Sequence, residues 1–87
     1  MAAHQTSALV PEGVGLHARP AALFVQQAAA FSSTIRLTCG ERTADGKSIL
    51  GVLQLGASAG STVGIHAEGE DAEKAAEGLA AFIREIA

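Results

Sequence analysis

Apolar and polar residues alternate in several short stretches of this chain. In residues 34–39 every second residue is apolar, which is typical of a strand with one buried face. The same alternation occurs in residues 61–67. Two further strands are predicted: residues 5–10, which end at a proline and a glycine-rich turn, and residues 42–44, which follow a tight turn. The pattern therefore predicts four short strands.

A second spacing, in which apolar residues recur after three and four positions, predicts three helices. The first covers residues 18–30, with Pro20 in its first turn, where the missing N–H costs nothing. The second covers residues 48–55, with Ser48 as its N-cap. The last follows Asp71, a second predicted N-cap, and has an apolar stripe along one side.

The predicted order of elements is strand, helix, strand, strand, helix, strand, helix. Four short strands with helices between them favour an α+β fold of two layers, in which the helices pack on one face of a single sheet. A chain of 87 residues leaves no room for a second core, so we expect a single domain over residues 1–87.

The composition indicates a globular protein and excludes several functional classes. Hydrophobic residues make up 48% of the chain, and the net charge of -3 argues against nucleic-acid binding. Residues 48–67 have no charged side chain, but their four glycines and several polar residues make them unsuitable for crossing a bilayer. With a single cysteine and no signal-peptide pattern at the N-terminus, we expect a cytoplasmic protein without membrane insertion.

The histidines and the cysteine do not indicate a metal site. The strongest candidate ligands are His4, His17, His66 and Cys39. No two of them lie two to five positions apart, the spacing expected of a local ligand pair. His4, close to a frayed terminus, and His66 are interpreted as exposed surface histidines, and Cys39 as a buried small apolar residue. We therefore expect neither a metal nor a cofactor.

His17 is the strongest candidate for chemistry. It directly precedes the first predicted helix, whose positive N-terminal end favours a bound anion. The same positive end disfavours imidazolium and helps to keep His17 neutral and nucleophilic. Arg19 could bind two anionic oxygens. The spacing alone leaves two interpretations open: an imidazole that accepts a phosphoryl group, or a capping histidine beside a surface arginine.

The residues around this histidine are Gly15-Leu16-His17-Ala18-Arg19-Pro20-Ala21. This motif closely resembles the phosphohistidine segment of the HPr family, the histidine-containing phosphocarriers of the bacterial phosphoenolpyruvate-dependent sugar phosphotransferase system. A second segment resembles the regulatory-serine helix of that family: Lys47-Ser48-Ile49-Leu50-Gly51-Val52-Leu53-Gln54-Leu55-Gly56. The resemblance extends over essentially the whole chain. It implies an open-faced sandwich with a four-stranded antiparallel sheet and three helices on one face.

The resemblance implies a phosphoryl carrier and not a stand-alone enzyme. In the family, enzyme I takes the phosphoryl group from phosphoenolpyruvate and passes it to Nδ1 of the histidine, here His17. The carrier then passes it to an enzyme IIA domain. By the family pattern, Arg19 stabilises the phosphoryl group in both transfers. We also expect the carrier to be a monomer.

The resemblance gives Ser48 a second role besides capping. It implies phosphorylation of Ser48 by an HPr kinase/phosphorylase, which would add negative charge and repel acidic partners. A transcription regulator is a further partner that the resemblance allows. If Val52 and Leu55 form the buried side of the second helix, its other large apolar residues cannot all be buried with them. These residues match the exposed patch through which partners dock in the family. The predicted docking residues are Leu16, Ala22, Ile49, Leu50 and Leu53, with Lys47 at the edge, either meeting acidic partners or simply solvated.

Three residues depart from the family pattern. Val14 stands in the turn where relatives often have a small polar residue, which puts a side-chain hydrogen bond to the phosphoryl group in doubt. Gln26 and Ala29 replace lysines of some relatives, which favours apolar over electrostatic docking.

Two alternative functions remain open. One is a regulatory or interaction module of the same fold that carries no phosphate, although regulatory-only relatives lack the histidine. The other is a phosphocarrier of a nitrogen-related or dihydroxyacetone phosphotransferase branch.

Overall fold

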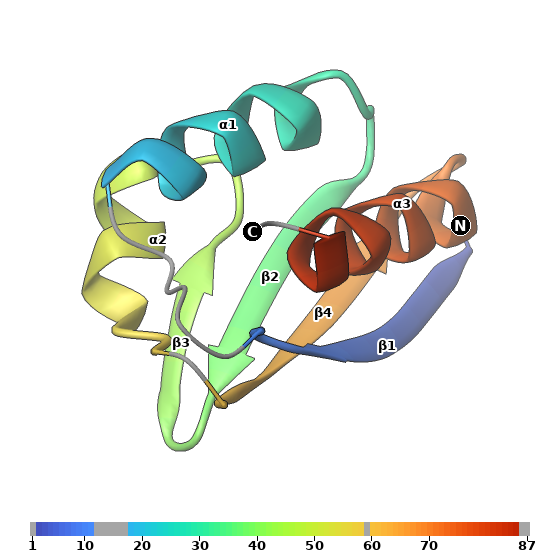
Figure 1. Ribbon diagram of the computed structural model, residues 1–87. Helices are drawn as coiled ribbons and strands as arrows, with labels where there is room; N and C mark the ends of the chain where they lie inside the picture. The colour runs from blue at the N-terminus through green and yellow to red at the C-terminus, as the bar shows by residue number, and fades with distance from the viewer. Residues whose placement is uncertain (1, 12–17, 59, 86–87) are drawn as a thin grey trace.

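The computed structural model describes residues 2–11, 18–58 and 60–85. The elements follow one another in the order that the sequence predicts (Figure 1). They are β1 (Ala3–Leu9), α1 (Ala18–Ala29), β2 (Thr34–Cys39), β3 (Arg42–Asp45), α2 (Ile49–Leu55), β4 (Thr62–Glu68) and α3 (Ala72–Glu85). The largest shift of a boundary is at β1, which starts two residues before the predicted strand because its first residues pair with the end of β4.

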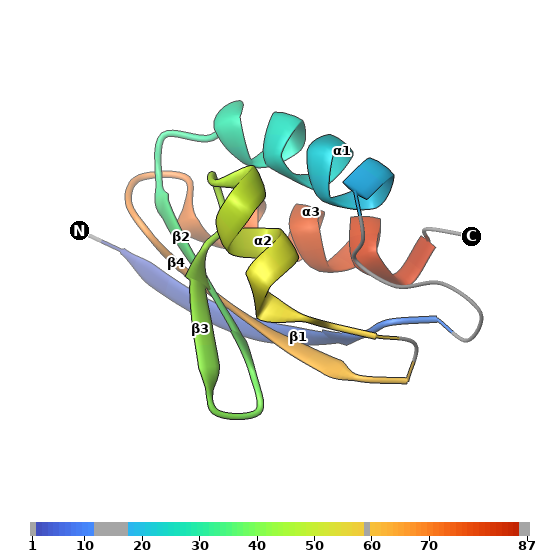
Figure 2. The same cartoon turned by 90° about the vertical axis from the view of Figure 1, so that its left-hand side faces the viewer.

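The four strands form one antiparallel sheet in the order β1-β4-β2-β3. All three helices lie on the same face of this sheet, and the other face is open (Figure 2). The predicted α+β two-layer fold is confirmed. The strands β1 and β3 are the edges of the sheet, so β4 and β2 form its centre and carry the longest runs of buried alternating residues.

The space between helices and sheet holds a single cluster of buried side chains, which comes from every element except β3. Most of its members are alanine, valine, leucine and isoleucine, and Phe24 is its largest side chain. Phe24 of α1 meets Phe82 of α3 edge to face, with ring centroids 6.1 Å apart, a favourable geometry for two aromatic rings. Cys39 is only half-buried, contrary to the prediction, because it is the last residue of β2, next to the hairpin turn.

Asp71 starts α3, but its side chain makes bonds that the sequence does not reveal. Its backbone carbonyl accepts from Ala75 N at 2.8 Å, as expected at a helix start. Its carboxylate accepts from the backbone N–H groups of Ser32 (2.9 Å) and Ser33 (3.0 Å) and from the Ser33 hydroxyl. Asp71 therefore joins the turn after α1 to the turn before α3.

These hydrogen bonds, chiefly the one from the Ser33 hydroxyl, lower the pKa of Asp71 to about 2, because they stabilise the ionised carboxylate. Ser33 is fully buried. Gly69 lies against it with φ 149°, and a Cβ on Gly69 would lie 2.6 Å from the Ser33 oxygen. Only glycine fits there without displacing this contact.

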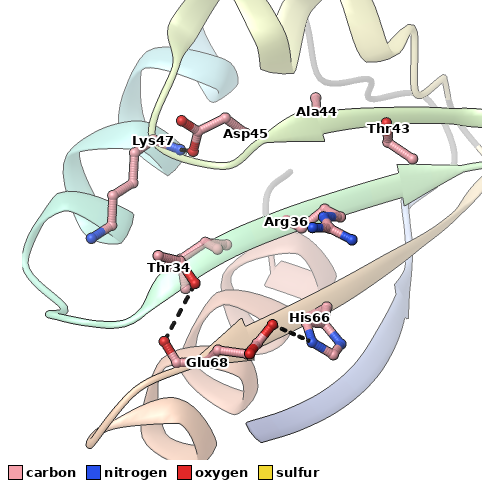
Figure 3. A pocket seen from close by; sticks show the side chains of 9 residues that line it. Thr34, Arg36, Thr43, Ala44, Asp45, Lys47, His66 and Glu68 are labelled. Atoms are coloured by element: carbon pink, nitrogen blue, oxygen red, sulfur yellow. Dashed lines mark hydrogen bonds and ion pairs between the residues drawn. The ribbon is translucent and has the colours of Figure 1, made fainter.

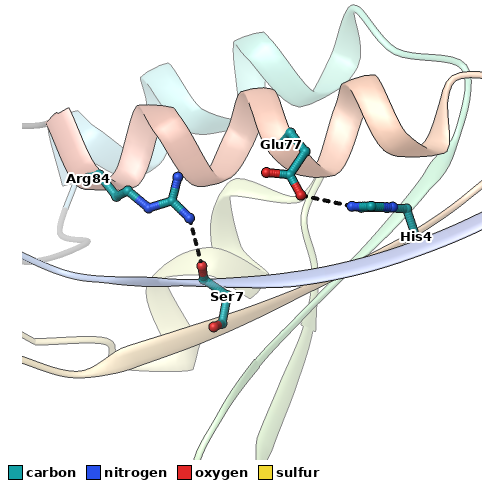
Figure 4. A network of polar contacts seen from close by, with 4 residues as sticks. All are labelled: His4, Ser7, Glu77 and Arg84. Atoms are coloured by element: carbon teal, nitrogen blue, oxygen red, sulfur yellow. Dashed lines mark hydrogen bonds and ion pairs between the residues drawn. The ribbon is translucent and has the colours of Figure 1, made fainter.

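The edge strand β1 is held against α3 by two polar contacts (Figure 4). His4 Nε2 lies 2.8 Å from Glu77 Oε2, and Arg84 donates to the carbonyl of Ser7 at 3.1 Å. His4 therefore lies in a paired strand and is half-buried, not at a frayed end as the sequence suggested.

Candidate functional site

The candidate site begins at the first turn of α1. Arg19 is exposed there and Pro20 is half-buried. α1 has no acidic residue in its first turn, so nothing in the helix itself compensates its positive N-terminal end. Three residues that the sequence analysis singled out lie outside the described residues: Val14, Leu16 and His17.

α2 is a helix of seven residues that is capped at both ends. Ser48 has an extended backbone (φ -114°, ψ 118°), and its hydroxyl accepts from Gly51 N at 3.0 Å. At the other end Gly56 takes the left-handed conformation (φ 69°), and its N–H donates to Leu53 O at 3.2 Å. The predicted N-cap role of Ser48 is confirmed. Such caps matter because a helix this short is marginal without them.

The outer side of α2 is apolar. Val52 and Leu55 are buried, whereas three large side chains are exposed to solvent. These are Ile49 (47% exposed), Leu50 (64%) and Leu53 (37%), which we call the α2 patch. Exposed apolar clusters of this kind are typical of interaction surfaces. The α2 patch agrees with the expectation that these side chains cannot all be buried together with Val52 and Leu55.

α1 and α2 lie in contact, side by side in both views (Figures 1 and 2). Ala22, predicted to dock partners, is half-buried in α1. Leu23 is 46% exposed and was missed in the sequence. Its signal is that it falls outside the buried stripe of α1. It shares a side of the helix with Gln27, which lines a small depression together with residues of α3. Leu23 therefore lies toward α3 and away from the α2 patch.

The ammonium of Lys47 is already bonded within the chain. Its Nζ donates to the carbonyl of Phe31 at 2.8 Å, in a partly buried position. Its backbone N–H donates to Asp45 Oδ1 at 2.9 Å. Lys47 is thus half-buried and bonded within the chain, not freely solvated, and its contact with acidic partners stays a prediction.

A depression of about 500 Å³ lies along β2, β3 and β4. Its polar lining has both charges, and His66 Nε2 lies 3.3 Å from Glu68 Oε1 (Figure 3). The residues that line it are Thr34, Ile35, Arg36, Thr43, Ala44, Asp45, Lys47, His66 and Glu68. Within the described part of the chain, no three His, Cys, Asp or Glu side chains gather as a metal site would require.

Comparisons with known proteins assign the chain to a family. The chain belongs to the HPr family: the family model for the PTS HPr component phosphorylation site matches residues 4–85. The chain is 46% identical to the HPr-like protein Crh of Bacillus subtilis over 71 residues. These aligned residues cover 82% of this chain and 84% of that protein. Over 69 residues it is 46% identical to the phosphocarrier protein HPr of Haemophilus influenzae, 79% of this chain and 81% of that protein.

Solved structures agree with this assignment. The crystal structure of a phosphocarrier protein HPr from Bacillus anthracis matches with a TM-score of 0.89 and 43% sequence identity. The match covers 95% of this chain and 99% of that one. HPr proteins are carriers of phosphoryl groups in the phosphotransferase system, so the predicted class of protein is confirmed.

The expected monomer gains no support from the relatives. A crystal structure of Bacillus subtilis Crh is described as a domain-swapped dimer. It is 45% identical to this chain, with a TM-score of 0.77 over 84% of both chains. An HPr from Thermoanaerobacter tengcongensis, 46% identical with a TM-score of 0.72 over 85% of both chains, is described as a dimer.

Among the described residues, no helix combines the length and the apolar character that crossing a membrane requires.

Proposed function

We propose that this chain accepts a phosphoryl group from phosphorylated enzyme I on His17 and passes it to an enzyme IIA domain. Family membership over residues 4–85 is the observation that supports this most strongly. The motif from Gly15 to Ala21 supplies the histidine and the arginine of the family's phosphohistidine segment. We propose the cytoplasm as the place of action, since a single cysteine suits a reducing compartment.

In the proposed transfer, a lone pair on Nδ1 of neutral His17 attacks phosphorus. The bond from phosphorus to the donor atom of enzyme I breaks as the new P–N bond forms. In the transfer to enzyme IIA, the acceptor histidine of that domain attacks the same phosphorus atom, and the P–N bond to His17 breaks as the new bond forms. Arg19, exposed in the first turn of α1, would neutralise charge on the phosphoryl oxygens in both steps. Such a reaction depends on positioning and charge compensation more than on a stand-alone catalytic apparatus.

Partners would dock on the α2 patch together with Leu16 and Ala22, the other predicted docking residues besides Lys47. The support is the exposure of three large aliphatic side chains on a helix in contact with α1. Burial of such side chains in an interface is favourable by about 25 cal/mol per Å². The same surface would serve both enzyme I and enzyme IIA, since the carrier must meet them in turn.

Ser48 is the proposed regulatory site, and an HPr kinase/phosphorylase is its proposed modifier. Its hydroxyl lies at the start of α2, directly before the α2 patch. A phosphate there would add about -1.5 to -2 charges beside the docking surface. The start of a helix tolerates this charge, so its effect would fall on partner binding and not on the fold.

The resemblance to Crh favours a second candidate function, a regulatory module that binds a transcription regulator without carrying phosphate. His17 and Arg19 argue against it, because a module of this kind does not need them.

Mass mapping after incubation with enzyme I and phosphoenolpyruvate separates the two candidates. The phosphocarrier gives acid-labile phosphate on the peptide that contains His17, and the variant His17→Ala gives none while it keeps its fold. Absence of labelling in the wild-type chain, with enzyme I shown to be active on another carrier, would refute the phosphocarrier and leave the regulatory module.

A further inference from the structure

α1 and α2 both lack a basic residue in their last turn. The C-terminal end of a helix is electrically negative, and a cation near it is stabilising. In α3 the helix itself supplies this cation with Arg84. For α1, the cation comes from elsewhere in the chain: Lys47 donates to the carbonyl of Phe31, two residues beyond the end of α1.

The backbone that presents Lys47 is itself firmly held. Gly46 N donates to Ile35 O of β2 at 2.8 Å. Gly46 is buried against this strand, since a Cβ on it would lie 2.5 Å from Ile35 Cγ2. The Asp45 carboxylate accepts from Lys47 N, and the Asp45 carbonyl accepts from Ser48 N at 3.1 Å. The side chain of Lys47 therefore extends from a fixed turn, away from the Asp45 carboxylate (Figure 3).

Two elements are joined by this one ammonium. Lys47 directly precedes Ser48, the N-cap of α2, and its Nζ is bonded at the far end of α1. A hydrogen bond from a charged donor in a partly buried position is stronger than one between neutral groups. The hydrogen bond from Lys47 to Phe31 therefore links the residue before the start of α2 to the turn after the end of α1.

We propose that Lys47 is a positioning residue that holds the start of α2 against the end of α1, and so sets the α2 patch relative to the first turn of α1. The consequence for phosphoryl transfer rests on the proposed function. The opposing view is that Lys47 serves only to contact acidic partners, through the ammonium N–H groups that the Phe31 carbonyl does not accept. Only the positioning role predicts that loss of the Lys47 ammonium changes local stability in the free protein.

The first test uses the free protein. Lys47→Met keeps an unbranched side chain, one atom shorter, and removes the charge. Lys47→Arg keeps the charge and can still donate to a carbonyl, and Lys74→Met is the control at an exposed lysine of α3. Amide hydrogen exchange is followed at Phe31 and Val52, whose N–H groups bond to Ala28 O (3.1 Å) and Ser48 O (2.9 Å). Local opening governs such exchange.

In Lys47→Met we expect both amides to exchange about ten times faster, the lower end of what loss of a charged donor produces. Lys47→Arg should restore most of the protection, and Lys74→Met should match the wild type. Amides between β1 and β4 should exchange at wild-type rates in all three variants, which shows that the fold is intact. Wild-type exchange at Phe31 and Val52 in Lys47→Met would overturn the proposal.

The second test is phosphoryl transfer at several salt concentrations. A positioning role predicts that Lys47→Met slows transfer from enzyme I and to enzyme IIA by similar factors, with the salt dependence of the wild type. A contact role predicts a flatter salt dependence, because a screened charge pair has been lost, and that result would overturn the proposal. If the wild-type chain is not labelled at all, the proposed function fails, while the exchange experiment still decides whether Lys47 positions the helices.

Discussion

Arg19 and Ser48 are the two proposed site residues whose side chains the structure places most directly. Arg19 is exposed at the start of a helix with no acidic residue in its first turn. Ser48 uses its hydroxyl to accept the N–H of Gly51. The first is therefore accessible to a ligand, whereas the second already has a structural role that any modification must preserve or replace.

We expect Arg19→Ala to remain a substrate of enzyme I but to transfer the phosphoryl group at least roughly tenfold more slowly, because a cation that stabilises the transition state is lost. Alanine favours helices, so α1 should persist. Quenched-flow measurement of single turnovers, forward and reverse, gives the rates. Arg36→Ala is the matched control, since Arg36 is exposed on the open face of the sheet. Equal rates for wild type and Arg19→Ala would remove Arg19 from the site.

At Ser48, two variants separate capping from charge. Ser48→Ala should lower the free energy of unfolding by about 1 kcal/mol, the usual effect of losing an N-cap, with little change in phosphorylation by enzyme I. Ser48→Asp should keep the cap and slow phosphorylation, since it places a negative charge beside the docking surface. Added salt should partly restore the rate of Ser48→Asp. Phosphorylation of Ser48→Asp at the wild-type rate in low salt would leave Ser48 as a cap only.

At the scale of elements, α2 has two apolar sides with different roles. Val52 and Leu55 bury one side against the core, and the α2 patch exposes the other. A helix of this length is marginal in water, so its buried side and its two caps stabilise it, and its exposed side is available for binding. Leu50 and Leu55 offer a matched pair within one helix.

We expect Leu50→Ala to change the free energy of unfolding by less than about 0.5 kcal/mol, as for other surface substitutions, and to weaken binding to enzyme I. Leu55→Ala should lower the free energy of unfolding by roughly 2–5 kcal/mol, because it opens a cavity in the core. Urea unfolding and titration calorimetry with enzyme I measure the two quantities. Unchanged binding by Leu50→Ala would argue against docking through the α2 patch.

At the scale of the whole molecule, contacts between distant turns hold the layers together. Asp71 binds Ser32 and Ser33 across the turns that precede β2 and α3. His4 with Glu77 and Arg84 with Ser7 hold α3 along the edge strand β1. The second pair also covers a backbone carbonyl of an edge strand, which otherwise invites pairing with another chain.

Acid should weaken the fold through Asp71. Its pKa is about 2 in the folded protein and about 3.9 in an unfolded chain. Its contribution to stability is therefore fully present above the unfolded pKa and is lost as the pH falls through the folded one. We expect Asp71→Asn to be less stable at pH 7 and to show a flatter decline of stability between about pH 5 and pH 2. Urea unfolding as a function of pH measures both effects.

Ser33→Ala is the companion variant, because it removes the first cause of the lowered pKa. The carboxyl of Asp71 should then titrate at a higher pH, as followed by its NMR chemical shift. Glu73→Gln, an exposed substitution in the first turn of α3, is the control for removal of a carboxylate. A stability profile of Asp71→Asn parallel to that of the wild type would contradict this account.

The sequence determined the elements and their order, because local spacing decides which residues can share a buried face. The alternation of Ile35 and Leu37 predicted β2, and the N-cap Ser48 predicted where α2 begins. The motif around His17 and Arg19 pointed to phosphoryl chemistry, and with it to the family. Each of these signals lies within a few positions along the chain, so no long-range contact was needed to detect it.

Only the tertiary structure decided which distant groups meet. It brings the Lys47 ammonium to the Phe31 carbonyl and the Asp71 carboxylate to Ser33, and it leaves Cys39 half-exposed. It also decides that the exposed Leu23 lies on the side of α1 toward α3, whereas the helical period shows only that Leu23 falls outside the buried stripe. The physical reason is that periodicity specifies one buried face for each element. The partners of a long or charged side chain depend on how the helices are placed on the sheet, which is set by packing across the whole core.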